Sequence, residues 1–279
     1  MSGTWHPETP EEEAAPVQIG PMGWVRVGLR GAPVLVVVLG GLAAMLLVRL
    51  IERPIFGVHR PVTPYITQGV CKSALVFMGI RLTVVGEHMA HNGAVVSNHV
   101  SWLDIFTLNA AKRIYFVAKS EVAGWPLIGW LARATGTVFI ARRSVDAKIH
   151  LDVFATRLNA GHKLLFFPEG TSTDGLRVIP FKSTLFEAFF AQESRDALHI
   201  QPVTVKYSAP AGEEARFYGW WGDMELAPHL LKTLAARKSG AVEVIYHAPV
   251  AVADFDGRKA LARYCEDTVR SGFGENGYA

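Results

Sequence analysis

One stretch of the chain is apolar without interruption, and it lies near the amino terminus. Residues 31–48 read GAPVLVVVLGGLAAMLLV and contain no charged side chain. At a helical rise of about 1.5 Å per residue, this stretch with Leu50 and Ile51 covers roughly the 30 Å hydrocarbon core of a bilayer. A basic segment at residues 49–54 follows, with no small-residue cleavage site after it. We therefore expect an uncleaved transmembrane or membrane-embedded helix, with a buried core helix as the alternative.

Shorter hydrophobic patterns with two different periods follow the apolar stretch. Alternating or continuous apolar runs, typical of strands, occur at residues 80–86, 93–98, 114–117, 137–140, 163–167, 199–207 and 242–247. Apolar residues at helical spacing occur at residues 65–78, 102–111, 145–160, 185–192 and 258–271. Strands that alternate with helices predict an α/β fold with a mostly parallel sheet flanked by helices.

The same pattern divides the chain into three parts. Residues 1–22 are rich in Pro, Glu, Gly and Thr, and we expect a mobile tail there. Residues 23–60 hold the membrane anchor and its flanks, and residues 61–279 form the α/β domain. More basic residues follow the apolar stretch than precede it, which favours an inner-membrane protein whose α/β domain faces the cytoplasm.

Composition excludes several other classes of protein. Half of the 279 residues are hydrophobic and 10% are aromatic, which rules out disorder over most of the chain. Its two cysteines, Cys71 and Cys265, lie far apart in the sequence, and neither has a second cysteine or a histidine at the spacing typical of metal ligands. We therefore expect neither a disulfide framework nor a metal site.

The first candidate for chemistry is SNHVSWLD at residues 97–104, where a buried strand should end and a helix begin. In parallel α/β sheets, ligands bind outside the carboxyl ends of the strands. Asp104 can reach the His99 imidazole across this turn, hold its tautomer and leave the other nitrogen as a general base. A plain helix cap with a solvated aspartate is the alternative. Ser101 is a conceivable nucleophile in the same turn.

A second candidate turn, FFPEGTSTDG at residues 166–175, also follows a predicted buried strand. Proline and glycine around Glu169 force a tight turn whose backbone N–H groups can hold an anionic head group or a developing oxyanion. Lys182 follows shortly and adds an ammonium group near the same rim. The alternative is an ordinary β-turn with a solvated glutamate.

Together, the two motifs resemble the signature blocks of the glycerolipid acyltransferase family, whose best-known members are 1-acylglycerol-3-phosphate acyltransferases. Four blocks follow in family order: His99-x4-Asp104, GTVFIAR at residues 136–142, FPEGT at residues 167–171 and IQPVTV at residues 200–205. The resemblance covers residues 86–207, and the combination is more specific than any single block.

The resemblance implies a role for each matching residue. His99 would be the catalytic base, and Asp104 would orient it. The acceptor-binding residues would be Glu169, Gly170 and Thr171, with Arg142 as a cationic contact and Lys182 on the same rim. The family transfers the acyl group directly from an acyl thioester, carried by acyl-carrier protein or coenzyme A, to a hydroxyl group. No bound cofactor is therefore expected.

Two departures from the family pattern concern the acceptor. Ser172 stands where the family has an arginine after FPEGT, and Ala141 replaces the usual acidic or amide residue. Arginine is the preferred bidentate partner of phosphate, so its loss favours a lysolipid with another head group. The segment FYGWWGDM at residues 217–224 also resembles the branch of the family that acylates lyso-ornithine lipid. We expect that acceptor, with lysophosphatidic acid as the alternative.

Two tryptophan-containing segments and a basic region indicate contact with lipid. Residues 122–132 predict an interfacial loop or short helix through which acyl chains enter, with a buried helix as the alternative. Trp220 and Trp221 are expected in the core, at the membrane interface or at the head group. Basic side chains in the middle third of the chain would attract an anionic membrane or an acidic acyl-carrier protein. No nucleic-acid-binding fold accompanies them, so nucleic acid is not an expected partner.

Two other functions remain open at this stage. A thioesterase would use water in place of the alcohol, and only a transferase needs the lysolipid to consume the thioester. A non-catalytic lipid-binding scaffold would keep its effect after His99→Ala, whereas an enzyme would lose its activity.

Overall fold

A sheet of eight strands forms the centre of the described part of the chain. This computed structural model describes residues 4–6, 18–125, 128–140, 147–190 and 197–274. The strands are β1 (Arg81–Val85), β2 (Gly93–Ser97), β3 (Tyr115–Lys119), β4 (Val138–Ile140), β5 (Leu164–Phe166), β6 (His199–Ser208), β7 (Ala241–Tyr246) and β8 (Val250–Ala251). Their order in the sheet is β1-β7-β6-β2-β5-β3-β4, with β8 paired to β6.

Most neighbouring strands in the sheet run parallel, as the sequence pattern predicts. Strand β2 lies between β5 and β6 and is parallel to both, while β6 pairs antiparallel with β7 and β8. All five residues of β2 are buried, which explains its continuous apolar sequence. Because β2 and β5 are parallel neighbours, their carboxyl ends lie side by side. The segments that follow them, residues 98–104 and 167–175, therefore meet at one edge of the sheet.

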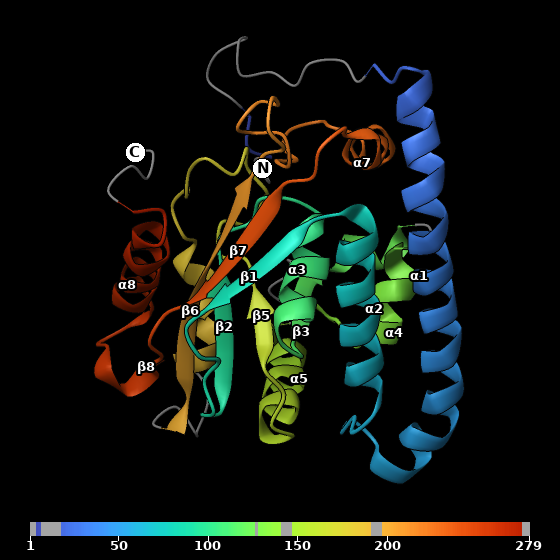
Figure 1. Cartoon of the computed structure of the whole chain (residues 1–279). Coiled ribbons are helices and arrows are strands. Elements are labelled where there is room, and N and C mark those ends of the chain that lie inside the picture. The colour runs from blue at the N-terminus through green and yellow to red at the C-terminus, as the bar shows by residue number, and fades with distance from the viewer. Residues whose placement is uncertain (1–3, 7–17, 126–127, 141–146, 191–196, 275–279) are drawn as a thin grey trace.

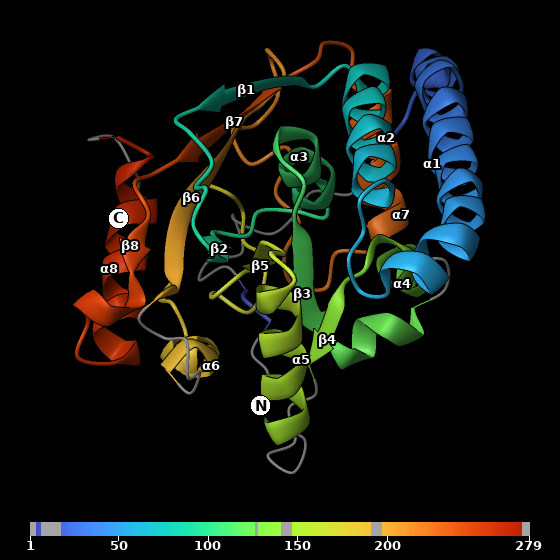
Figure 2. The same cartoon turned by 90° about the horizontal axis from the view of Figure 1, so that it is seen from below.

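Helices cover both faces of the sheet (Figures 1 and 2). The helices are α1 (Pro21–Phe56), α2 (Thr63–Met78), α3 (Leu103–Ala111), α4 (Ile128–Thr135), α5 (Ala147–Asn159), α6 (Glu187–Phe190), α7 (Leu226–Ala235) and α8 (Arg258–Ser271). Short 3₁₀ turns are η2 (Ser120–Gly124), η4 (Ser183–Phe186) and η6 (Val252–Asp254). Helices α2 and α3 pack on one face, and α5, α6 and α8 pack on the other.

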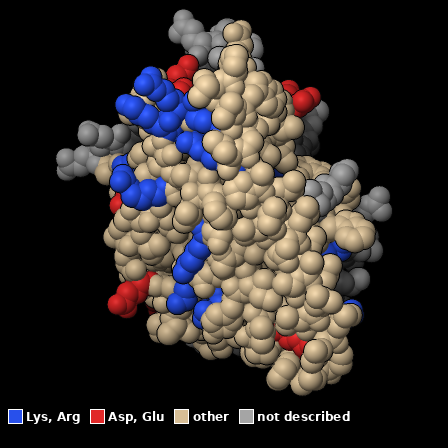
Figure 3. Space-filling view, turned by 45° about the vertical axis from the view of Figure 1, so that its right-hand side comes forward, with Lys and Arg blue, Asp and Glu red and all other residues tan. Residues whose placement is uncertain are grey.

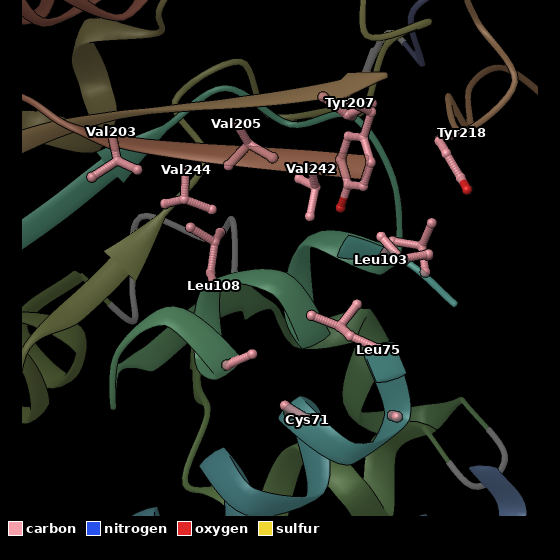
Figure 4. Packing of buried hydrophobic residues seen from close by; sticks show 14 of the residues in the cluster. Cys71, Leu75, Leu103, Leu108, Val203, Val205, Tyr207, Tyr218, Val242 and Val244 are labelled. Carbon is pink, nitrogen blue, oxygen red and sulfur yellow. The ribbon is translucent and has the colours of Figure 1, made fainter. Parts of the chain in front are cut away.

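Two hydrophobic clusters hold these layers together. One joins α2 and α3 to β6 and β7, and the other joins α5, α6 and α8 to β2 and β5. Figure 4 shows the first cluster, with Tyr207 extending from the sheet toward α3. The sheet is therefore buried on both faces. Polar side chains that are accessible to a ligand are expected at the ends of its strands.

Helix α1 confirms the predicted long apolar helix, and it lies along the outside of α2. The two helices approach closely, since a Cβ at Gly41 would overlap a methyl group of Val70. At one end of α1, Arg30 donates hydrogen bonds to backbone carbonyls of α7 and its C-cap at 3.1 and 2.9 Å. At the other end, Glu52 accepts hydrogen bonds from the backbone of residues 62 and 63 at 2.8 and 3.1 Å. Both ends of the helix are thus bonded to the rest of the protein.

The outward face of α1 is apolar and open. Leu29, Val36, Leu47 and Leu50 are each at least 65% exposed, and only Gly23, Met45 and Glu52 of this helix are buried. Figure 3 shows this side of the molecule, where a broad area carries few Lys, Arg, Asp or Glu side chains. By length and composition the helix meets the requirements of a membrane-spanning segment.

The predicted mobile tail at residues 1–22 differs from the structure at two places. Helix α1 already begins at Pro21. Proline fits the first turn of a helix, because backbone N–H groups in that turn have no hydrogen-bond partner within the helix. Residues 4–6 lie against loops of the α/β domain, where Trp5 contacts Thr171.

Candidate active site

His99 and Asp104 form a hydrogen-bonded pair where β2 ends and α3 begins. The His99 Nδ1 lies 2.8 Å from Asp104 Oδ2. The Asp104 carboxylate is fully buried, while the imidazole is 20% exposed. A carboxylate that accepts from Nδ1–H leaves Nε2 as the basic nitrogen of a neutral imidazole. The spacing predicted from sequence therefore places both residues in hydrogen-bond contact at the carboxyl edge of the sheet.

Asp104 is held by several further donors. Its Oδ2 accepts the backbone N–H groups of Val100 and Ser101 at 2.7 and 3.1 Å, because the chain turns tightly between strand and helix. Its Oδ1 accepts the Tyr207 hydroxyl at 2.9 Å. Burial and the neighbouring Asp104 carboxylate raise the pKa of Tyr207 well above its ordinary value, so this phenol stays a donor. These contacts fix the carboxylate from two sides.

The backbone around His99 is also fixed by two buried polar side chains. Asn98 exchanges two hydrogen bonds with the backbone of Val205 on β6, at 2.9 and 2.8 Å. Glu169 accepts the His99 backbone N–H on one oxygen at 2.5 Å and the Ile179 N–H on the other at 3.0 Å. Glu169 therefore ties the turn after β5 to the turn after β2.

Glu169 is completely buried, and burial raises the pKa of its carboxyl well above the ordinary value, while the two N–H donors lower it. Its described contacts are with backbone, and each of its two oxygens accepts a backbone N–H group. The contact with substrate that the family resemblance implies stays a prediction.

The imidazole of His99 rests on an aromatic surface. Its ring stacks on Phe167, with centroids 4.0 Å apart and an interplanar angle of 12°. Phe167 in turn stacks on Phe116 at 5.9 Å. The Phe167 side chain thus sets the tilt of the ring, while Asp104 sets its rotation about the Cβ–Cγ bond.

The turn after β5 brings the other predicted site residues to the same edge. Gly170 adopts a left-handed backbone with φ of 73°, and a Cβ there would stand 2.6 Å from Lys182 Nζ. The left-handed backbone therefore favours glycine, and its missing side chain leaves room for the flexible end of Lys182. Thr171 is partly exposed, and its Oγ1 accepts the Trp5 backbone N–H at 3.4 Å. Lys182 is exposed beside this turn. We call Gly170, Thr171 and Lys182 the acceptor rim.

A third loop, residues 217–224, closes over the two turns. The Trp220 backbone N–H donates to the Val100 carbonyl at 2.9 Å, which joins this loop to the residue after His99. Trp221 is buried at 5% exposure, and the Trp220 indole donates to the Met224 carbonyl at 2.8 Å. Both tryptophans thus have packing and hydrogen-bonding roles within the loop, in line with the core-packing alternative.

Three residues at this edge, Arg177, Trp102 and His229, were not singled out by sequence reasoning, whereas Asp174 is, with Glu169 and Asp223, a candidate partner for a head-group ammonium. Asp174 is buried and pairs with Arg177 at 2.9 Å, and the Arg177 guanidinium carbon lies 5.1 Å from the centre of the Trp5 ring. The Trp102 indole donates to Nδ1 of His229 on α7 at 2.9 Å. Burial lowers the pKa of His229 to about 4, which keeps this acceptor neutral. A sequence gives no local signal for these pairs, except that Arg177 lies three residues after Asp174.

Other sequence-based predictions have varied outcomes. Arg142 lies outside the described residues. Ser101 is fully buried, and its Oγ accepts the Leu103 N–H at 3.3 Å, so the hydroxyl stabilises the turn before α3 and is not an exposed nucleophile. Of the predicted segment at residues 122–132, residues 122–124 belong to η2 and residues 128–132 to α4, while residues 126 and 127 lie outside the described residues. Its two tryptophans, Trp125 and Trp130, are 45% and 65% exposed. Among the described residues no cluster of three metal-ligating side chains occurs.

The arrangement is suited to proton transfer. It offers one partly exposed imidazole whose tautomer and orientation are fixed, and the turn that carries the rim is hydrogen-bonded to the backbone of His99 through Glu169 and Thr173. Such a base can remove a proton from a hydroxyl group held at the rim.

Comparison with known proteins gives a consistent result. Residues 81–206 match the family described as Acyltransferase. The chain is 56% identical to the lyso-ornithine lipid O-acyltransferase of Rhodobacter capsulatus over 250 residues, which cover 90% of this chain and 91% of that protein. It is 32% identical to a 1-acyl-sn-glycerol-3-phosphate acyltransferase of Neisseria gonorrhoeae, over 72% of this chain and 77% of that protein.

The fold also resembles a solved structure. This is the 1-acyl-sn-glycerophosphate (LPA) acyltransferase PlsC of Thermotoga maritima, with a TM-score of 0.62 and 19% sequence identity. The likeness covers 90% of this chain and 95% of that chain. It concerns the fold, and it includes the α/β core on which His99 and Asp104 are placed.

Proposed function

The chain belongs to the 1-acylglycerol-3-phosphate acyltransferase-like family, in its lyso-ornithine lipid branch, and from this membership we propose a specific reaction. The protein is an enzyme that transfers acyl groups to a lysolipid. We propose that the acceptor is the free hydroxyl of lyso-ornithine lipid, and that the donor is an acyl thioester on acyl-carrier protein or coenzyme A. The observation that supports this acceptor is the 56% identity to the Rhodobacter capsulatus lyso-ornithine lipid O-acyltransferase.

His99 acts as the general base in the proposed mechanism. An alcohol is a poor nucleophile at neutral pH, so Nε2 removes the hydroxyl proton as the oxygen attacks the thioester carbonyl. Asp104, hydrogen-bonded to Nδ1, stabilises the imidazolium that forms. The C–S bond then breaks, and the proton on Nε2 passes to the leaving thiolate. The thioester is already activated, and for that reason no acyl-enzyme intermediate is proposed.

The acceptor rim supplies the contacts for the head group in this proposal. The rim presents the Lys182 ammonium over Gly170 and the Thr171 hydroxyl beside it, while Ser172 replaces the arginine of the family pattern. A phosphomonoester is bound best by several guanidinium groups, whereas an amino-acid head group carries a single carboxylate and an ammonium. The rim is therefore proposed to bind the zwitterionic head group in preference to a phosphate.

The test uses detergent-purified full-length protein, a labelled acyl-carrier-protein thioester and two acceptors assayed side by side. One acceptor is lyso-ornithine lipid and the other is lysophosphatidic acid, with His99→Ala as the blank. A higher kcat/KM for lyso-ornithine lipid is the expected result. Preference for lysophosphatidic acid would overturn the proposed acceptor and would agree with the similarity to the Neisseria gonorrhoeae enzyme.

Two further outcomes of this assay concern the type of protein. Thioester consumption that does not depend on either lysolipid would indicate a thioesterase. Equal product from His99→Ala and the wild-type protein would remove His99 from the mechanism. A repeat with acyl-coenzyme A as donor decides between the two thioesters.

We also propose that α1 lies in one face of the membrane and does not cross it, with the α/β domain on the cytoplasmic side. The support is that both ends of α1 bond to the α/β domain, at Arg30 and at Glu52. Cysteines introduced at Gly20 and His59, one beyond each end of the helix, should react with an impermeant maleimide from the same side of sealed vesicles. Labelling of the two cysteines from opposite sides of the vesicle membrane would show that the helix spans the membrane.

A further inference from the structure

A cluster of cationic side chains lies at the amino edge of the sheet, at the opposite edge from His99. Arg60 follows α1 in the loop to α2, and Arg157 lies near the end of α5. Each donates a hydrogen bond to a carbonyl of the turn between α4 and β4, Arg60 to Ala134 at 2.7 Å and Arg157 to Gly136. Strand β4 begins directly after this turn, which places the cluster where the parallel strands start. Figure 1 shows the end of α1 at the end of the molecule away from α7.

The two guanidinium groups converge beside Gly136. A Cβ at this glycine would stand 2.8 Å from Cζ of Arg60 and 3.2 Å from Nη2 of Arg157. The two positive charges therefore lie close together, where like charges repel each other. Burial and repulsion from Arg49 and Arg157 lower the pKa of Arg60 to about 10. An anion bound to both groups would offset this repulsion.

Within the described residues, the carboxylate that faces this cluster is Glu52, and its oxygens are already occupied. One oxygen accepts the guanidinium of Arg49 at 3.0 Å, and the other accepts the backbone N–H groups of residues 62 and 63 at 2.8 and 3.1 Å. In the described part of the chain neither Arg60 nor Arg157 forms an ion pair. The charge of these two groups is therefore not neutralised by a described side chain.

Both guanidinium groups also keep donors that no described group uses. The Nε atoms of Arg60 and Arg157 are buried without a partner. The second Nη of each group makes no described hydrogen bond either, and it is not sealed from solvent. Native proteins leave few buried donors unpaired, so several of them in one place indicate a ligand that accepts hydrogen bonds.

A buried histidine belongs to the same cluster. His162 is 5% exposed, and neither of its ring nitrogens has a described partner. Its ring stacks on Tyr115 with centroids 4.2 Å apart, and Cζ of Arg157 lies 4.5 Å from the centre of the same Tyr115 ring. Burial and the charges of Arg157 and Arg60 lower the pKa of His162 to about 3, so the imidazole stays neutral. The cluster thus holds unpaired polar atoms from three side chains.

The surface beside the cluster belongs to the apolar helix. Near the end of α1, Leu50, Ile51 and Ile55 are 72%, 68% and 65% exposed. Lipid tails match such a face, and the head groups lie at the level where a membrane helix ends. A phosphate accepts hydrogen bonds on several oxygens and is a preferred partner of guanidinium groups, and basic groups beside membrane helices bind lipid head groups.

We infer that Arg60 and Arg157 form a binding site for the phosphate of a membrane phospholipid, separate from the acceptor site. The phospholipid is bound there and not acylated, because His99 lies at the other edge of the sheet. The inference rests on contact between α1 and lipid. It holds whether the helix lies in one face of the membrane or crosses it, since the end of the helix lies at the head groups in both cases. It does not depend on which lysolipid is the acceptor.

The experiment titrates phosphatidylglycerol into the full-length protein in micelles of an uncharged detergent, and the rise in thermal midpoint gives the Kd. Arg60→Gln and Arg157→Gln should each raise this Kd roughly tenfold, because each removes a charged donor to the phosphate. Arg263→Gln is the matched control, since Arg263 lies on α8 and its side chain is 85% exposed. This control should bind phosphatidylglycerol as the wild type does. An unchanged Kd in both cluster variants would overturn the inference.

Two further ligands separate the phosphate from the lipid. Inorganic phosphate has the anion without the chains, and diacylglycerol has the same chains without the phosphate. Each should bind at least roughly tenfold more weakly than phosphatidylglycerol, because each lacks one part of the ligand. Inorganic phosphate that binds as tightly as the lipid would show a site for the free anion and would overturn the lipid assignment. Diacylglycerol that binds as tightly would remove the role of the two arginines.

Arg157→Lys covers the case in which Arg157→Gln folds poorly. The lysine keeps a positive charge but lacks the planar fork of the guanidinium, so the Kd for phosphatidylglycerol should rise several-fold. A Kd equal to that of the wild type would mean that charge alone attracts the lipid, and the proposed site would fail.

Catalytic constants show whether the cluster is distinct from the acceptor site. In detergent without phospholipid, kcat and the acceptor KM of the Arg60 and Arg157 variants should stay within about twofold of the wild type, because these side chains are at the opposite edge from His99. A tenfold rise in the acceptor KM, with either lysolipid, would place the acceptor at the cluster and overturn the separate site. The preference between the two lysolipids tests the proposed acceptor and leaves the Kd for phosphatidylglycerol unaffected.

Discussion

The turn at residues 98–104, which carries His99 and which we call the corner, lies next to the acceptor rim. The two regions are held in place in different ways. In the corner, Asp104 is fully buried and accepts bonds of 2.7–3.1 Å from groups close by, chiefly the backbone of the same turn. At the rim, Lys182 is exposed, and the described partner of Thr171 from outside its own turn is Trp5 at 3.4 Å. The base is therefore rigidly oriented, while the head-group contacts come from distant segments. With this division, substitutions at the rim can change which head group is bound without disturbing the orientation of the catalytic base.

The largest expected effect comes from Asp104→Asn, in the rigid corner. An amide keeps the shape of the side chain but favours the wrong tautomer of His99 and cannot stabilise its imidazolium. We expect kcat to fall on the order of 10³–10⁴-fold, by analogy with other histidine–aspartate pairs, while the KM for the acceptor stays within about twofold. Rapid-quench or steady-state assays with the labelled thioester measure both constants. A variant that keeps a tenth of the wild-type kcat would show that the corner is not the catalytic centre.

Tyr207→Phe is expected to have an intermediate effect, because it removes one donor and leaves the backbone donors in place. A hydrogen bond to a carboxylate contributes about 1.5–3 kcal/mol, of which part is lost from the transition state. We expect kcat to fall roughly tenfold with little change in acceptor KM. Tyr246→Phe is the matched control, since Tyr246 is also buried but has no described hydrogen bond to Asp104. Equal activities of the two variants would mean that the backbone N–H groups alone position the carboxylate.

The smallest effect is expected at the rim, from Lys182→Ala. The ammonium is exposed and solvent screens it, so its removal should cost no more than about 1 kcal/mol of acceptor binding. We expect a few-fold rise in acceptor KM, an unchanged kcat and a difference that shrinks as the salt concentration is raised. Lys238→Ala, another exposed lysine, serves as the control. A large loss of kcat instead would place Lys182 with the corner and would remove the distinction between the two regions.

Sequence reasoning predicts the corner well because the corner is local. His99 and Asp104 are five residues apart, and the turn between a buried strand and a helix leaves few ways to place them. The placement of this turn and the turn at residues 167–175 at one edge of the sheet also follows from the sequence, because parallel strands end at the same edge. That β2 and β5 are direct neighbours is seen only in the structure. The seven strands predicted from apolar runs agree with the structure to within two residues at each end, while the short β8 is not among them.

The contact between the rim and the amino-terminal segment could not be predicted in the same way, because it joins distant parts of the chain. A short stretch rich in Pro and Glu near the amino terminus has the composition of a mobile tail, and only the folded structure shows Trp5 against Thr171. Glu169 was expected to contact substrate, yet its described partners are backbone N–H groups of His99 and Ile179. Motif resemblance identifies such a residue as important without saying whether it supports a turn or binds a ligand.

The attachment of α1 at both ends has a consequence for lipid distribution. On the proposed placement, the apolar helix and the catalytic edge form one rigid body, since Arg30 and Glu52 bond to the same domain that carries His99. The depth of the reaction centre is then fixed relative to a single monolayer, and lysolipid in the opposite monolayer cannot reach it. The acylated product would therefore be formed in one leaflet only. Equal amounts of it in both leaflets would require a separate step that moves the lipid across the bilayer.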